Sequence, residues 1–343
     1  MQQDNKRIIE LDALRGIAAL SVFFYHASIY YKDSIYFSIF RFGLTGVDLF
    51  FIISGFVIFS SINNKTRIQF VKSRFLRLYP SYWLAVTFTF ILIIIKYYEK
   101  GILHLLPIKQ YFVNLSMIQE FFHIENLDGP YWTLYVELFF YVIIFLFLSK
   151  ESMIYIILGS ISIISTLVRY DLLPSVFPFS FLTNTPISAQ SSLFLAGILF
   201  YKLMISKNKL YFVPILACLI CQTLILKSHY LVAKIQDINF YEHIFLLILF
   251  FLIFSLLVYN KLFFFKIKYL LYLGNISYAL YLTHQYLTTE ILEYYLVKRK
   301  EVSLGLTIFL VAFPIAVCTA YFFNKITDKL NQKLKVILNK KLI

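Results

Sequence analysis

The sequence predicts an all-α integral membrane protein, a polytopic bundle of about ten transmembrane helices forming a single membrane-embedded domain over residues 1–343. Two features of the composition support this. Of the 343 residues, 60% are hydrophobic and 15% are charged, whereas soluble proteins carry about 25% charged residues. The chain also contains 38 Phe and 27 Tyr. A bilayer accommodates this much apolar surface, which a soluble domain of this size cannot bury.

The third observation is a series of apolar runs, because about 17 mostly apolar residues are enough to cross the hydrocarbon core as a helix. The polar first ten residues and the absence of a small-residue cleavage site favour a first span over a cleaved leader. The longest connection, 97–130, has an amphipathic centre that predicts a short interfacial or re-entrant helix. The predicted spans are 8–30, 44–62, 80–96, 131–149, 152–168, 187–204, 210–226, 243–260, 269–290 and 302–323.

The basic residues predict the orientation of these spans. With both termini placed in the cytoplasm, the inner segments carry 20 Lys and Arg and the outer segments carry 11, as the positive-inside rule requires. The net charge of +14 is then a property of the inner face, where anionic lipid is the expected partner. We therefore expect a multi-pass protein of the bacterial cytoplasmic membrane and no nucleic-acid partner.

Four charged residues lie inside predicted spans at least four residues from either end: Asp12, Arg15, Asp48 and Glu137. Such residues cost at least about 2.5–3.5 kcal/mol near the bilayer centre, so they usually have a function or pair with one another. No two candidate ligands share a helix at metal-ligand spacing, so we expect no metal site. The C-x-x-C of Cys218 and Cys221 lies in an apolar run without a second ligand pair, which indicates packing.

Two ionisable residues of the first span share one helical face. Arg15 and His26 are eleven positions apart, which is about 20° past three full turns and about 16 Å along the axis. A lone histidine in a membrane is often a hydrogen-bonded packing residue, but a buried arginine on the same face favours a functional role.

Further polar residues are predicted at a similar depth, in the outer part of other spans. Asp48 lies about one turn below the outer surface, and Glu137 and His284 reach the outer third of their spans. Together with His26 they predict a polar cavity open to the outer side, near which Trp132 and Tyr281 would contact a substrate. Ser54 and Gly55 fall near mid-membrane, where small residues permit either close helix packing or the approach of a ligand to the backbone.

The opposite face carries the densest group of basic residues. Arg74 and Arg77 are three positions apart, so they are neighbours if this stretch is helical. Such a pair suits phosphate binding. The alternative is an anchor that only fixes the topology.

These residues form a set that resembles the acyltransferase-3 family of bacterial membrane O-acyltransferases, which act on surface glycans. The resemblance covers nearly the whole chain in family order, and the lack of an appended soluble domain after the last span indicates the stand-alone type. The matching blocks are Leu11-Asp12-Ala13-Leu14-Arg15-Gly16 with His26, Gly46-Val47-Asp48-Leu49-Phe50-Phe51 to Ser54-Gly55-Phe56, Arg74-x-x-Arg77-x-x-Pro80-x-x-Trp83, Trp132-Thr133-Leu134 to Glu137, and Ser277-Tyr278 to His284.

The resemblance implies a cytoplasmic acyl-coenzyme A donor, usually acetyl-CoA, and an outer acceptor hydroxyl on an envelope polysaccharide or glycolipid. It also implies that Arg15 and His26 are essential. No permanently bound cofactor is expected. Arg74, Arg77, Ser54 and Gly55 would contact the donor.

The chemistry requires a base, because a sugar hydroxyl is a poor nucleophile at neutral pH. Histidine suits this role, so His26 is the expected base. Asp48 or Glu137 would orient it. Arg15 would bind pantetheine, phosphate or the carbonyl oxygen. Direct transfer and an acyl-histidine intermediate both remain open.

The separation of donor and acceptor predicts a narrow tunnel. A pantetheine arm on the order of 15–20 Å spans the axial distance from Arg15 to His26 obtained from the helical rise. Ser54-Gly55 would border this tunnel, and Asp48, Glu137 and His284 would line its outer mouth.

Two other classes of membrane protein are alternatives. A transporter or flippase of a lipid-linked glycan would also have intramembrane charges, but it predicts two related halves, and the sequence has no such internal similarity. A glycan polymerase would be expected to have a large outer loop.

Overall fold

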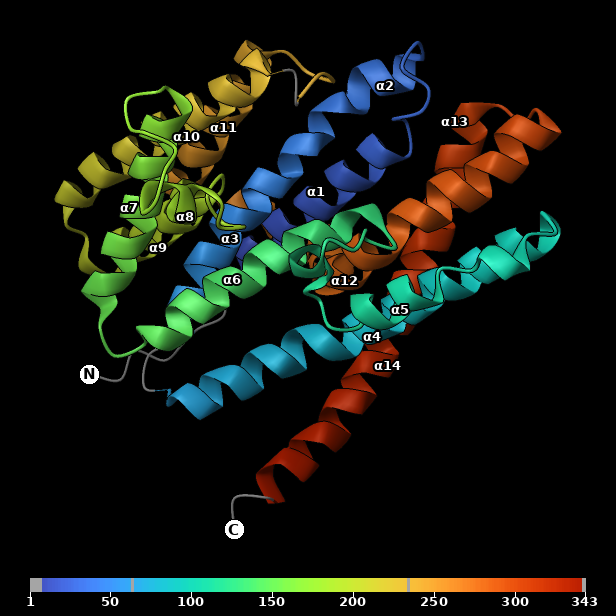
Figure 1. The fold of residues 1–343 in the computed structure, drawn as a ribbon, viewed down its shortest axis with the longest axis horizontal. Coiled ribbons are helices and arrows are strands. Elements are labelled where there is room, and N and C mark those ends of the chain that lie inside the picture. The colour runs from blue at the N-terminus through green and yellow to red at the C-terminus, as the bar shows by residue number, and fades with distance from the viewer. Residues whose placement is uncertain (1–7, 63–64, 233–234, 341–343) are drawn as a thin grey trace. The chain divides into compact units, whose positions relative to one another are not determined.

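The computed structural model describes residues 8–62, 65–232 and 235–340, and these residues form helices and connections without a strand (Figure 1). The contacts between Cα atoms divide the chain into two units. Unit 1 consists of Met1–Ala18, Leu44–Asn63 and Phe139–Asn275, and unit 2 of Ala19–Gly43, Asn64–Leu138 and Ile276–Ile343. Three helices contribute residues to both units: α1 (Ile9–His26), α6 (Trp132–Leu146) and α12 (Lys268–Gln285).

Unit 1 is built around α9, a short apolar helix whose residues are mostly buried. Helix α9 contacts the helices α3, α7, α10 and α11 of this unit (Figure 1). Each of these neighbours belongs to a segment that is long and apolar enough to cross a membrane. The helices of unit 1, beside the shared ones, are α3 (Gly46–Ser60), α7 (Glu151–Arg169), α8 (Phe179–Thr183), α9 (Ser191–Ser206), α10 (Phe212–Leu231) and α11 (Phe240–Val258).

Glycines set the closest helix contacts of unit 1. A Cβ atom at Gly55 on α3 would lie 2.1 Å from the carbonyl oxygen of Phe194 on α9, and one at Gly197 on α9 would lie 2.1 Å from that of Ile52. A Cβ at Gly274 on α12 would likewise lie 1.9 Å from the carbonyl oxygen of Asp12 on α1. Any side chain at these positions would collide with the neighbouring backbone. The helices can approach this closely only because the positions are glycine.

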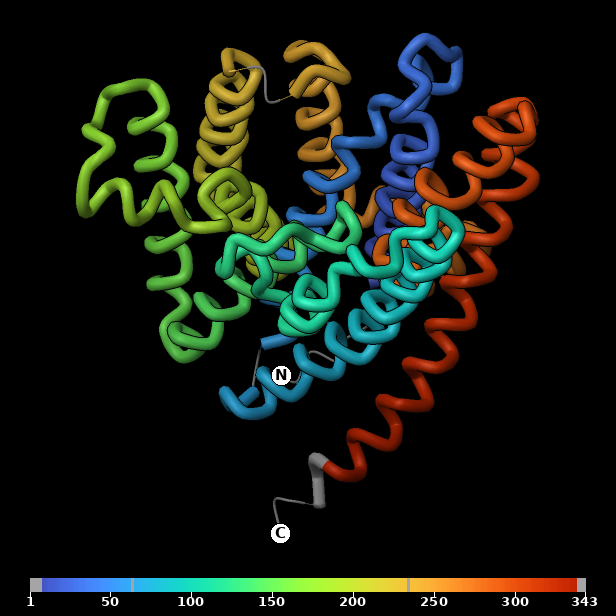
Figure 2. Tube along the Cα trace, turned by 45° about the vertical axis from the view of Figure 1, so that its right-hand side comes forward, coloured from blue at the N-terminus to red at the C-terminus, as the bar shows by residue number. Residues whose placement is uncertain are grey.

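Unit 2 contains two long helices, α4 and α14, which contact each other (Figure 2). The Ser81 hydroxyl donates to Thr327 Oγ1 at 3.0 Å across this contact. A capping box of Thr66 and Gln69 starts α4, satisfying two backbone donors at its first turn. The helices of unit 2, beside the shared ones, are α2 (Ile35–Phe40), α4 (Arg67–Glu99), α5 (Ile108–Asn114), α13 (Leu304–Leu306) and α14 (Phe313–Lys340).

Two π-helices interrupt the end of unit 2. The first, η7 (Tyr286–Lys298), continues directly from α12, and the second, η8 (Thr307–Ala312), precedes α14. A π-helix is rare and occurs mostly as a single turn at functional sites. The 13 residues of η7 therefore mark the segment after His284 as unusual.

Each predicted span is occupied by helix, and the prediction of an all-α membrane protein is confirmed at this level. Seven helical segments in the described part of the chain are long and apolar enough to cross a membrane. Helix α9 is apolar but shorter. The total of ten spans and the cytoplasmic position of the termini remain predictions. The basic stretch before Pro80 is helical as well, since α4 begins at Arg67 and not near the predicted residue 80.

Candidate active site

A pair of histidines forms the centre of the candidate site in unit 2. His26 is the last residue of α1 and His284 lies in the last turn of α12. His26 Nδ1 lies 2.9 Å from His284 Nε2. His284 is 1% exposed, whereas His26 is only partly buried. Both residues were predicted at a similar depth, but their direct contact was not predicted.

The surroundings of His284 fix which ring nitrogen carries a proton. His284 Nδ1 lies 3.1 Å from the carbonyl oxygen of Leu280 and 2.9 Å from that of Tyr281. Carbonyl oxygens only accept hydrogen bonds, so Nδ1 is the donor and Nε2 of a neutral His284 is an acceptor. His26 must then donate from Nδ1, which leaves the lone pair of His26 Nε2 available as a base.

Aromatic and hydroxyl groups hold His284 in place. Its ring centroid lies 5.9 Å from that of Tyr281 and 6.2 Å from that of the fully buried Phe23. The Tyr281 hydroxyl is hydrogen-bonded to Thr133 Oγ1 on α6 at 3.0 Å. This hydrogen bond and the ring contact hold Tyr281 beside the histidine. The role of Tyr281 in substrate binding remains a prediction.

The expected carboxylates fall in different units. Glu137 lies one helical turn after Thr133 on α6, on the face that meets Tyr281, and within electrostatic range of Tyr281. Asp48 belongs to unit 1, where its carboxylate accepts from His243 Nε2 at 2.7 Å. Within unit 2 the ring partner of His26 is therefore a histidine, whereas a carboxylate was expected. The catalytic roles of Asp48 and Glu137 remain predictions.

Sequence reasoning missed the partners of Asp48. His243, 2% exposed on α11, contacts the Tyr230 hydroxyl of α10 through Nδ1 at 3.1 Å. Asp48, His243 and Tyr230 thus form a polar chain that links three helices of unit 1, with the buried His243 at its centre. The signal in the sequence is a histidine at the first position of the predicted span 243–260.

The small residues of α3 include one close helix contact. Gly55 packs against the backbone of Phe194, where an added Cβ would lie 2.1 Å from the carbonyl oxygen. This is the close helix packing that small residues permit. Donor binding by Ser54 and Gly55, and the tunnel, remain predictions. Arg15 lies on α1, and its Nη1 is 3.4 Å from Asp12 Oδ1.

The predicted phosphate-binding residues lie on α4 in unit 2. The guanidinium of Arg77 lies 5.7 Å from the ring centroid of Tyr278 on α12. Burial, and then the positive charge of Arg74, lower the pKa of Lys65, which precedes the helix. Two cations within electrostatic range of each other favour an anion between them. The Tyr278 hydroxyl donates to the carbonyl of Leu78 at 3.2 Å, which attaches the middle of α12 to α4.

A second missed residue, Asp128, lies in the connection just before α6. It is 3% exposed and its two carboxylate oxygens accept from the Tyr286 backbone N–H at 3.2 and 3.3 Å. Burial raises the pKa of Asp128 to about 7, although the N–H donors of Tyr286 and Gly129 act in the opposite direction. Asp128 thereby holds the start of η7 two residues after His284. Trp132 lies near this connection and is 36% exposed, and its role in substrate binding remains a prediction.

Comparisons with known proteins identify the family of the chain. The chain matches the profile of a family described as an acyltransferase domain over residues 8–325. It is 30% identical over 132 residues to a protein of Acidianus two-tailed virus named as a candidate acetyltransferase, the match covering 38% of each chain. It is 38% identical over 92 residues to "Protein 2 in picA locus" of Rhizobium radiobacter, covering 25% of this chain and 45% of that protein.

The chain thus spans less than half the length of these two relatives, and no solved structure matches it significantly. The family profile, in contrast, covers α1 with His26, all of α12 with His284, and every helix between them. The chain therefore belongs to the acyltransferase-3 family of acyl-transferring enzymes.

Proposed function

We propose that this protein is a membrane O-acyltransferase that moves an acyl group, acetyl in the first instance, from cytoplasmic acyl-CoA to a hydroxyl of an envelope glycan. The observation that carries the proposal is the His26–His284 pair, whose hydrogen bonds leave one imidazole nitrogen of His26 free to act as a base. Membership of the family supports the reaction class.

The proposed reaction begins at the acceptor hydroxyl. His26 Nε2 removes the hydroxyl proton while the hydroxyl oxygen bonds to the thioester carbonyl carbon. The carbon–sulfur bond then breaks, and His26 returns the proton to the sulfur of coenzyme A. The products are the glycan ester and free coenzyme A, so atoms and charge balance without a further reactant.

His284 acts in this scheme as a positioning residue. When His26 becomes an imidazolium, the hydrogen bond from its Nδ1 to His284 Nε2 is made by a charged donor and is stronger than before. The stabilisation grows as the transition state forms, which is the requirement for catalysis. The backbone carbonyls of Leu280 and Tyr281 keep His284 from turning its own N–H toward His26.

The donor is proposed to bind through its phosphates at the start of α4. Lys65 and Arg74 lie within electrostatic range of each other there, and Arg77 lies on the same helix one turn later. A diphosphate would neutralise this concentration of positive charge. Arg15 is proposed to contact the pantetheine arm or the thioester carbonyl.

The glycan acceptor and the bacterial cytoplasmic membrane are proposed on the family resemblance, the apolar helices and the distribution of basic residues. The test is to incubate the purified protein with acetyl-labelled coenzyme A and membranes containing envelope glycan. An acyltransferase transfers the label to the glycan and releases coenzyme A in equal amount. A flippase would move the glycan without consuming the thioester, and that result would refute the proposal.

A further inference from the structure

Cations gather in unit 2 where the end of α4 packs against η7. Three of them surround one aromatic ring, because the centroid of Tyr294 lies 5.7 Å from Lys96 Nζ, 5.8 Å from Lys100 Nζ and 5.5 Å from Arg299 Cζ. Each distance is within the range of a cation–π interaction. We name this set the η7 patch; its members are Lys96, Lys100, Tyr294, Lys298 and Arg299.

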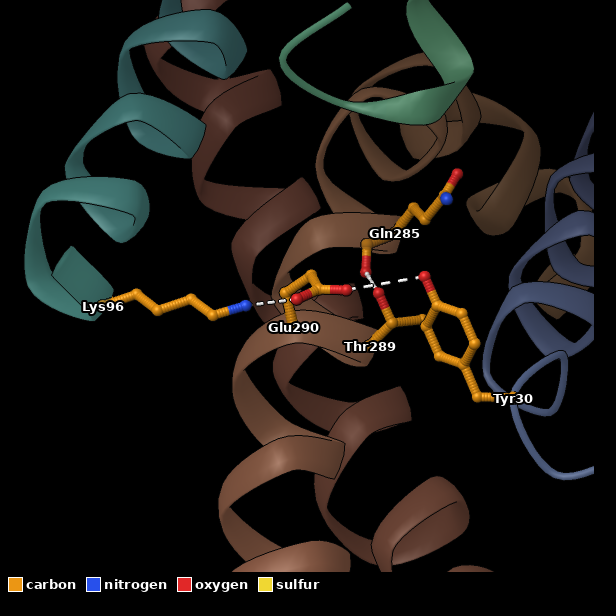
Figure 3. A network of polar contacts seen from close by, with 5 residues as sticks. All are labelled: Tyr30, Lys96, Gln285, Thr289 and Glu290. Atoms are coloured by element: carbon orange, nitrogen blue, oxygen red, sulfur yellow. Dashed lines mark hydrogen bonds and ion pairs between the residues drawn. The ribbon is translucent and has the colours of Figure 1, made fainter. Parts of the chain in front are cut away.

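Two cations of the η7 patch have carboxylate partners. Lys96 forms an ion pair with Glu290, which also accepts from the Tyr30 hydroxyl at 3.4 Å (Figure 3). Arg299 Nη1 lies 4.0 Å from Glu99 Oε2, at the outer limit of an ion pair, and the Arg299 side chain is 54% exposed. Arg299 is therefore only weakly neutralised.

The other two cations, Lys100 and Lys298, have no carboxylate partner among the residues that the structure describes. Both side chains are exposed, and Lys298 Nζ lies 5.9 Å from the ring centroid of Tyr30. Burial raises the pKa of Glu293 to about 9, although the charge of Lys298 acts in the opposite direction. Glu293 is thus protonated at neutral pH and does not neutralise Lys298.

The charge balance of the η7 patch is therefore positive, with four cations against the carboxylates of Glu99 and Glu290. The next two residues of the chain, Lys300 and Glu301, have opposite charges. The carboxylate of Asp128, which accepts from the backbone of η7, is buried below the surface. An anion that reaches this surface would meet an excess of positive charge.

The η7 patch lies far from the cations proposed to bind the donor. Lys100 follows Arg77 by 23 residues, which is about 35 Å of helix at 1.5 Å per residue. The patch is instead continuous with η7, which follows directly from α12 and His284. A diphosphate held near Arg77 does not reach it, so the anion that it suits belongs to the other reactant, the acceptor.

The mixture of groups in and around the η7 patch favours a glycan over a lipid surface. The Glu99 side chain is 39% exposed, so it would repel anionic lipid headgroups, whereas it can accept hydrogen bonds from sugar hydroxyls. The half-buried ring of Tyr294 is amphipathic and offers surface on which a sugar ring can pack. The unpaired ammonium groups would bind carboxylate or phosphate substituents of the same glycan.

We propose that the η7 patch is a docking surface for the acceptor and that this acceptor is an anionic glycan, whose charged groups pair with the cations of the patch. The inference rests on the proposed transferase function and adds the charge of the acceptor and a surface that binds it.

The test compares two double variants with the same loss of charge. Lys100→Gln/Arg299→Gln removes two exposed cations of the η7 patch, and the control Lys325→Gln/Lys329→Gln removes two exposed cations of α14. Lys325 is a matched position, since its Nζ lies 4.5 Å from the ring centroid of Tyr321. All four side chains are exposed, so thermal unfolding in detergent should stay close to that of the wild type.

Binding is measured without acetyl-CoA, using fluorescent oligogalacturonate and its neutral methyl ester as probes. The wild-type protein should bind oligogalacturonate more tightly than the ester, and added salt should reduce the difference. The patch variant should weaken oligogalacturonate binding by about three- to twentyfold, since each exposed charged contact contributes up to about fivefold. The α14 variant should bind as the wild type does.

Equal binding of the two oligomers, or an equal loss in both double variants, would overturn the inference. Short-chain phosphatidylglycerol is a third probe, and a loss of its binding alone in the patch variant would identify a lipid anchor and also overturn it. In transfer from labelled acetyl-CoA to membrane glycan, the patch variant should raise the half-saturating glycan concentration with little loss of kcat; an unchanged value would show that the patch does not serve the acceptor. Absence of transfer by the wild-type protein would instead refute the proposed function, whatever the binding results.

Discussion

The hydrogen bonds of His284 lead to a prediction that distinguishes its two ring nitrogens. In His284→Gln the side-chain Oε1 reaches close to the position of Nε2, so it can still accept from His26 Nδ1. In His284→Asn the amide nitrogen lies close to the position of Nδ1, so it can still donate to the carbonyls of Leu280 and Tyr281. The asparagine variant keeps the attachment to α12, but it leaves His26 Nδ1 without its acceptor.

The expected ratio of kcat values follows from the one hydrogen bond that differs between the two variants. The bond joins His26 Nδ1 to position 284 at 2.9 Å in the wild type and has a charged donor once His26 is protonated in the transition state. Such bonds contribute about 1.5–3 kcal/mol, and each 1.36 kcal/mol corresponds to a tenfold change in rate. His284→Asn should therefore have a kcat about 10- to 150-fold below that of His284→Gln.

The assay is single-turnover transfer of labelled acetyl from acetyl-CoA to membrane glycan, with thermal unfolding in detergent as the control for folding. Neither amide can act as a base, so a catalytic base at position 284 would make both variants equally inactive. That result, or an asparagine variant as active as the glutamine variant, would refute the positioning role of His284.

Three further predictions concern packing, pH and the donor. Gly55→Ala should destabilise the protein by about 1–3 kcal/mol, because its Cβ overlaps the Phe194 backbone. The control Gly159→Ala, whose Cβ meets only one side-chain atom at 3.7 Å, should be neutral or stabilising. Equal melting temperatures in both variants would contradict the packing role of Gly55. Burial raises the pKa of Asp128 from its ordinary 3.8 to about 7, so its contribution to stability is complete below pH 3.8 and is lost as the pH rises through 7. Thermal unfolding between pH 4 and pH 8 should therefore show a smaller loss of stability in Asp128→Asn than in the wild type, and parallel profiles would disprove the assignment. Replacing Arg74 and Arg77 together by Gln should raise the KM for acetyl-CoA more than it lowers kcat, and an unchanged KM would identify them as topology anchors.

The helical framework was predictable because each span has to satisfy its own backbone hydrogen bonds in lipid, and only apolar runs of sufficient length can do so. The depth of a residue along its span was also predictable, and for this reason His26 and His284 were both expected in the outer part of the bundle. Depth alone does not determine which residues meet. The contact between these two histidines depends on how α1 and α12 pack.

Two contacts could not be predicted, for the same physical reason. Small residues at mid-span permit either ligand approach or helix packing, and the packing of Gly55 against Phe194 is visible only in the folded chain. Asp48 was grouped with His26 by depth, but its partner is His243 on a helix of unit 1. The π-helical conformation of η7 was not predicted either, because its first residues fall at the end of the predicted span 269–290 and were expected to be α-helical.

The role of His26 as the base is tested most directly by measuring acetyl-CoA binding and acetyl transfer in His26→Ala. Because His26 is proposed to remove the proton from the acceptor hydroxyl, this variant should bind acetyl-CoA with the affinity of the wild type. It should also show no transfer of labelled acetyl to membrane glycan above the background of membranes without the protein. Binding is measured by equilibrium dialysis on the same purified sample, so a folding defect is detected separately. Transfer by His26→Ala at a substantial fraction of the wild-type rate would show that His26 is not the base.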